Sequence, residues 1–71
     1  MLRDINKKIG EQLKARRLAM NLSQRELAEI MNLHPNNVYE TENGKRGISV
    51  QTLEKYCKAL KLRIELVENE Q

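Results

Sequence analysis

Short polar side chains crowd residues 34–43, HPNNVYETEN, and their types suit hydrogen bonding to the edges of nucleic-acid bases. Asn can bond adenine through both amide atoms, Glu can accept from the cytosine amino group, and Tyr can contact a phosphate or a thymine methyl group. A helix over this segment with Val38 facing a core would turn the candidate base-reading residues outward, namely Pro35, Asn36, Asn37, Tyr39 and Glu40. Free N–H groups and the positive dipole end at its N-terminus would attract an anion such as a phosphate.

Glu40 has two interpretations of about equal weight: it contacts a base, or it pairs with a nearby basic side chain. His34 is not expected to act as a catalytic base, because no sequence pattern supplies the partner that such a base needs. One His and one Cys cannot form a zinc site within one chain. We therefore expect no enzyme activity, no catalytic residue, no metal and no cofactor.

A first short helix, over about residues 23–31, is predicted to precede the polar segment. Ser23 and Glu26 have the S-x-x-E spacing of a capping box. Leu27, Ala28 and Met31 form a one-sided apolar stripe.

The polar segment itself is predicted to form a second helix, over about residues 35–43. Asn32 can end the preceding helix in the left-handed conformation, and Pro35 suits the first position of the next helix. Asn43-Gly44 is a strong stop signal. The two helices and their short turn therefore position the candidate base-reading residues.

Two longer helices are expected to flank this pair. The first covers about residues 3–20, and its apolar side chains recur at three- and four-residue steps: Leu2, Ile5, Ile9 and Leu13. The last covers about residues 50–60, begins after the capping residue Ser49, and turns Leu53, Cys57 and Leu60 inward.

The period changes to two after residue 61, which predicts a half-buried strand over residues 61–67. An isolated strand leaves its ladder groups unpaired, so we expect two copies of the chain to pair here. The apolar dimerisation residues are Leu62, Ile64 and Leu66, and residues 68–71 are expected to be a frayed tail. The alternative is that the whole segment is frayed.

Length and composition limit the possible classes of protein. With 71 residues the chain is at most one domain, assigned to residues 1–60, and its core is small enough that oligomerisation would help. A net charge of +3 is a modest excess whose distribution matters more than its sum. No apolar run is long enough for a membrane span and no signal-peptide pattern is visible, so we expect a cytoplasmic, nucleoid-associated protein without membrane contact.

A Leu-Ser-Gln start at residues 22–24, Ala28, a short turn and a Glu-Asn-Gly end at residues 42–44 resemble the helix-turn-helix domains of phage repressor and Cro-type (XRE) regulators. The resemblance covers about residues 9–60 and implies an all-α, lambda-repressor-like bundle of four helices, here with a C-terminal β-strand. In similar proteins, positions matching Asn36, Asn37 and Glu40 face the major groove. The resemblance also implies a structural pair, Arg17 with Glu42, and phosphate contacts from Gln24, Arg25, Asn43, Lys45 and Arg46.

The core followed at once by L-R-I-E-L-V resembles the HipB group of antitoxins. This implies a homodimeric repressor of its own operon that binds a palindromic operator in double-stranded DNA and a HipA-like kinase toxin. One alternative is a free-standing repressor of phage or restriction-modification type. The alternative from another class is a protein-interaction module that neutralises an enzyme without binding DNA.

Overall fold

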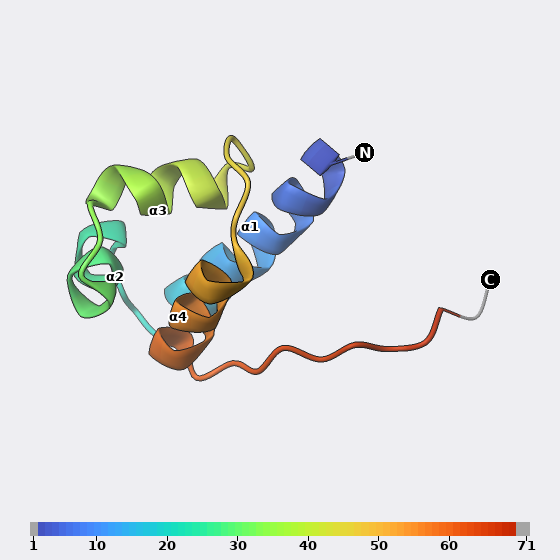
Figure 1. Cartoon of the computed structure of the whole chain (residues 1–71). Helices are drawn as coiled ribbons and strands as arrows, with labels where there is room; N and C mark the ends of the chain where they lie inside the picture. Colours follow the sequence, from blue (N-terminus) through green and yellow to red (C-terminus); the bar gives the residue numbers. More distant parts are fainter. Residues whose placement is uncertain (1, 70–71) are drawn as a thin grey trace.

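The structure is a computed structural model that describes residues 2–69 of the chain, with side chains from residue 4 onward. It contains four helices: α1 (Leu2–Ala19), α2 (Gln24–Met31), α3 (Pro35–Glu42) and α4 (Val50–Leu60). Helices α1 and α4 lie against each other, and α2 and α3 form a bent pair packed on them (Figure 1). The four predicted helices are confirmed. The Leu2 side chain and residues 70–71 of the expected tail lie outside the described residues.

Local capping explains where α2 and α3 begin. The Ser23 hydroxyl accepts the backbone N–H of Glu26 at 3.0 Å, and the Glu26 carboxylate accepts the backbone N–H of Ser23 at 2.8 Å. Donation to the Glu26 carboxylate, first from the backbone N–H of Ser23 and then from the Ser23 side chain, lowers the pKa of Glu26 from its ordinary value of 4.5. Asn32 ends α2 in the left-handed conformation with φ 57°, and His34 Nδ1 caps α3 by accepting the backbone N–H of Asn36.

All four helices contribute to one apolar core, whose buried members are Leu13, Leu27, Ala28, Met31, Val38, Tyr56 and Leu60. Two residues on the predicted inward faces differ from expectation. Ile5 is exposed, and Leu53 packs against the core only from its edge. Ile5 lies near the N-terminal end of α1, and Leu53 borders an open groove between α1 and α4. A helical period alone does not reveal either position.

Tyr56 occupies the centre of the core and is fully buried. Its hydroxyl lies under α3 near Thr41, but it makes no hydrogen bond of regular geometry with any side chain or backbone group in residues 2–69. Burial raises the pKa of the Tyr56 phenol. The phenol is therefore protonated at neutral pH. Its buried hydroxyl lacks the hydrogen bond that would offset the loss of contact with water.

The predicted strand over residues 61–67 is not seen. Lys61 ends α4 with φ 56°, and residues 62–69 follow as a segment that is neither helix nor strand (Figure 1). A strand needs a neighbouring strand for its ladder hydrogen bonds, and the helices of a single chain offer none. Apolar side chains of the segment are consequently exposed, Leu66 to 96%.

No helix within residues 2–69 combines the length and the apolar character that crossing a lipid bilayer requires.

Candidate nucleic-acid interface

The exposed face of α3 carries the predicted base-reading residues. Val38 is buried, which turns Pro35, Asn36 and Tyr39 to the surface. Asn37 and Glu40 lie at the edge of this face and are partly buried. The three exposed side chains are therefore free to approach a ligand, whereas the two at the edge have contacts within the chain.

A buried ion pair fixes α3 against α1. Arg17 Nε donates to Glu42 Oε2 at 2.6 Å and Arg17 Nη2 donates to Glu42 Oε1 at 3.0 Å, which is a bidentate arrangement. Arg17 Nη1 also donates to the carbonyl of Leu22 at 2.6 Å. Since both charged side chains are almost fully buried, this brace joins the end of α3 to α1 and to the start of the α2 segment.

Gln24 extends the brace from the first turn of α2. Its amide Nε2 donates to Glu42 Oε1 at 3.0 Å, so the side chain is partly buried and directed toward α3. Arg25, the next residue, is exposed. Of these two predicted phosphate contacts, only Arg25 therefore has its side chain free in this structure.

The loop after α3 brings two more predicted phosphate contacts beside Tyr39. Asn43 Nδ2 donates to the carbonyl of Tyr39 at 2.8 Å and thereby helps to end the helix. The Lys45 ammonium lies 5.4 Å from the centre of the Tyr39 ring, in a cation–π arrangement. The loop therefore carries a cation at the edge of the exposed α3 face.

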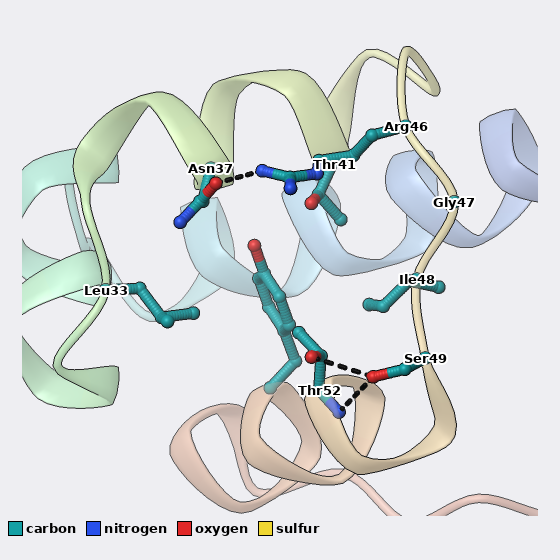
Figure 2. A pocket seen from close by; sticks show the side chains of 9 residues that line it. Leu33, Asn37, Thr41, Arg46, Gly47, Ile48, Ser49 and Thr52 are labelled. Carbon is teal, nitrogen blue, oxygen red and sulfur yellow. Dashed lines mark hydrogen bonds between the residues drawn. The ribbon is translucent and has the colours of Figure 1, made fainter.

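Arg46 reaches back from the loop to α3, as Figure 2 shows. Its Nη1 donates to Oδ1 of Asn37 and lies 3.4 Å from Oε1 of Glu40. The pairing of Glu40 with a basic side chain, one of its two interpretations, is therefore present in the free chain, and its contact with a base stays a prediction. Asn37 and Arg46 line a cavity of about 280 Å³ that extends to Tyr56.

Two glycines contribute to the interface without facing a ligand. The stop signal at Gly44 was predicted, but the close approach of each glycine to a neighbouring segment was not. A Cβ at Gly10 of α1 would collide with the carbonyl oxygens of Thr41 and Glu42. A Cβ at Gly44 would lie 2.8 Å from Cα of Lys7, and its φ of 67° also favours glycine. An isolated glycine within a helical pattern was the available signal at Gly10.

Cys57 lies on the opposite side of the bundle, facing α1, and burial raises the pKa of its thiol. The thiol is therefore protonated at neutral pH, as suits a small packed side chain.

The two short helices α2 and α3 with their tight turn, the brace that fixes α3 against α1, the exposed polar face of α3 and the cationic loop define a helix-turn-helix protein. Comparison with known sequences agrees, since the helix-turn-helix family matches residues 13–67. The chain belongs to the XRE-type helix-turn-helix family. No curated protein sequence matches the chain.

Comparison with solved structures also finds helix-turn-helix regulators. The chain is similar to the clp gene regulator ClgR from C. glutamicum, with 30% identity and a TM-score of 0.80 over 90% of this chain and 78% of that one. It is also similar to the restriction-modification controller protein C.AhdI from Aeromonas hydrophila, with 32% identity and a TM-score of 0.80 over 84% of this chain and 91% of that one. The family and these neighbours identify the chain as a DNA-binding transcriptional regulator.

Proposed function

We propose that this regulator represses transcription by binding a palindromic operator as a homodimer, with α3 in the major groove of each half-site. The observation that carries the proposal is the exposed face of α3, with Asn36 and Tyr39 at the surface and Lys45 beside them. The Arg17–Glu42 brace supports it, because base readout requires a helix held in a fixed position.

In this proposal the residues at the interface have two roles. Base edges are contacted from α3 by Pro35, Asn36, Asn37, Tyr39 and Glu40. The phosphates on either side are contacted by Gln24, Arg25, Asn43 and Lys45, which precede and follow α3 in the sequence. Arg46 is tied to Asn37 and Glu40 on α3 and is assigned a different role.

An electrophoretic mobility shift tests DNA binding and separates the two roles. Asn36→Ala should cost about 1–3 kcal/mol on the operator, the range for a lost bidentate base contact, and little on random DNA. Lys45→Ala should weaken binding to all sequences and lower the salt dependence by roughly one counterion.

Lys58→Ala is the matched control, because it removes an exposed cation from the last turn of α4, away from α3. If Asn36→Ala weakened random DNA as much as the operator, Asn36 would not be a base-reading residue. If no DNA bound better than random DNA, the protein would belong to the other class considered, an interaction module.

The proposed dimer uses the C-terminal segment as a strand. Leu62, Ile64 and Leu66 border an apolar groove of about 580 Å³ whose floor contains Leu13 and Leu53. Antiparallel pairing of two copies would satisfy the backbone groups of both segments and bury these side chains over the groove. A two-fold axis there would present two α3 helices to one face of DNA, and a palindromic operator needs them roughly 34–36 Å apart.

Analytical ultracentrifugation tests this dimer. Removal of residues 61–71 should give a monomer that has lost most of its operator affinity. In the full chain, Ile64→Glu should have the same effect, since a charge would enter the apolar groove, whereas Glu65→Gln should leave the dimer intact. A truncated chain that remained a dimer would refute strand pairing.

The similarity of this chain to the solved structure of a restriction-modification controller favours a free-standing regulator over an antitoxin. Binding of a HipA-like kinase, which the L-R-I-E-L-V resemblance implies, has no support from the geometry of residues 2–69 beyond the exposed apolar segment. Calorimetric titration of such a kinase encoded beside this gene would decide: saturable binding supports the antitoxin function, and its absence supports the free-standing one.

A further inference from the structure

We propose that Arg46 and Glu40 together select a G·C base pair in the operator, so that Arg46 determines specificity and is not a general phosphate contact. The proposal rests on the function proposed above and deepens it. The contacts of the Arg46 side chain are not those expected of a phosphate-binding residue. Arg46 does not extend freely from its loop but is tied to Asn37 and Glu40 on α3.

The position of this cluster makes it available to a base pair. Asn37 and Glu40 are three residues apart on α3, so their side chains project from neighbouring turns of one face. The side chains of Arg46 and Glu40 remain 44% and 38% exposed. The guanidinium is thus placed at the edge of the exposed α3 face, beside a carboxylate, and both groups remain open to solvent.

Arg46 and Glu40 each retain hydrogen-bonding groups that their contacts within the chain do not use. Arg46 uses Nη1 for both contacts to α3, which leaves the donors on its other nitrogens for a ligand. Glu40 uses Oε1, which leaves Oε2 as an acceptor. The pair therefore offers neighbouring donors followed by one acceptor.

This order matches one base pair in the major groove. Guanine presents two acceptors, N7 and O6, and its paired cytosine continues with an amino donor at N4. An A·T pair presents an acceptor, a donor and an acceptor, so the adenine amino group would face the guanidinium. The Arg46–Glu40 pair consequently favours G·C. Pairing also neutralises Glu40, whose isolated carboxylate would repel the phosphates of any DNA.

Arg46→Lys gives the decisive variant. Lysine keeps the charge that a phosphate contact needs, but it lacks the planar fork that can hold Asn37 and Glu40 and still face a base. The experiment first finds the preferred operator of the full chain by selection from random DNA. It then measures the affinity of each variant for operators in which every G·C pair of a half-site is changed to A·T.

The wild-type protein should lose roughly 5- to 150-fold in affinity at one such pair, the range for a bidentate contact. Arg46→Lys and Glu40→Gln should both reduce the preference at that same pair, because each removes part of the donor and acceptor pattern, and Arg46→Lys should leave the salt dependence unchanged. Lys45→Ala, the neighbouring cation, should keep the preference and weaken every sequence. Circular dichroism melts of all variants should match the wild type, because the altered side chains are at the surface.

An undiminished G·C preference in both Arg46→Lys and Glu40→Gln would overturn the proposal. So would an equal loss on all sequences in Arg46→Ala accompanied by the loss of one counterion, which would make Arg46 a phosphate contact. Both results leave the proposed function intact, since the wild type still prefers its operator. A wild-type chain without any preferred operator would overturn the proposed function itself.

Discussion

Breaking the Arg17–Glu42 brace should remove a large part of the stability of this small domain. In Glu42→Ala, Arg17 would lose both hydrogen bonds of the bidentate pair and retain only the Leu22 carbonyl among the partners described above. Gln24 would lose an acceptor as well. A buried charge left in this state typically costs 3–5 kcal/mol.

This loss is large compared with the expected free energy of unfolding of the whole chain. Typical stability per residue gives a chain of 71 residues about 4–11 kcal/mol. Glu42→Ala should therefore remove between about a quarter and all of that stability. Replacing both partners, as in Arg17→Met with Glu42→Leu, should recover most of the loss, because no uncompensated charge remains.

Urea unfolding followed by circular dichroism, at one fixed protein concentration, measures these differences. Glu40→Ala is the matched control, since its partner Arg46 is at the surface and an exposed pair contributes only about 0–1 kcal/mol. If Glu42→Ala cost no more than Glu40→Ala, or if the double variant were as unstable as the single one, the argument from buried charge would be wrong.

Three further predictions concern the core and a helix cap. Leu27→Ala should cost about 2–5 kcal/mol and Leu53→Ala clearly less, because Leu27 is fully buried and Leu53 only partly; equal losses in thermal melts would contradict this. Tyr56→Phe should leave the free energy of unfolding unchanged or raise it, because the buried hydroxyl has no full partner; a loss above about 1 kcal/mol would mean that it bonds to Thr41 in solution. The pKa of Glu26 is lowered by folding, so its contribution is present above pH 4.5 and is lost as the pH falls through the lowered pKa; Glu26→Gln should unfold less steeply with acid, and an unchanged acid profile would argue against the capping box.

Structural features that depend on residues close together in the sequence could be predicted. The capping box at Ser23 and Glu26, the left-handed end at Asn32 and the first-turn Pro35 each act within four residues, so α2 and α3 could be placed closely. The inward position of Val38 followed from the same placement.

Structural features that depend on contacts between distant parts of the chain could not be predicted from the sequence. The exposure of Ile5 and the partial burial of Leu53 depend on how four helices are rotated against one another. The contact of Arg46 with Asn37 depends on the path of a loop without any repeating pattern. The alternation after residue 61 was visible, but a strand there requires a second molecule, which the sequence of one chain does not describe.

The close approach at Gly10 has a consequence for redesign. Because α1 touches the last carbonyls of α3 through Gly10, and the following loop touches Lys7 through Gly44, one face of α1 acts as a fixed base for both. New target sequences could be sought by exchanging exposed residues such as Asn36 and Tyr39, which do not reach this base. An alanine at Gly10 would instead displace all the α3 side chains together, so that a library designed to change specificity should leave α1 unaltered at that position.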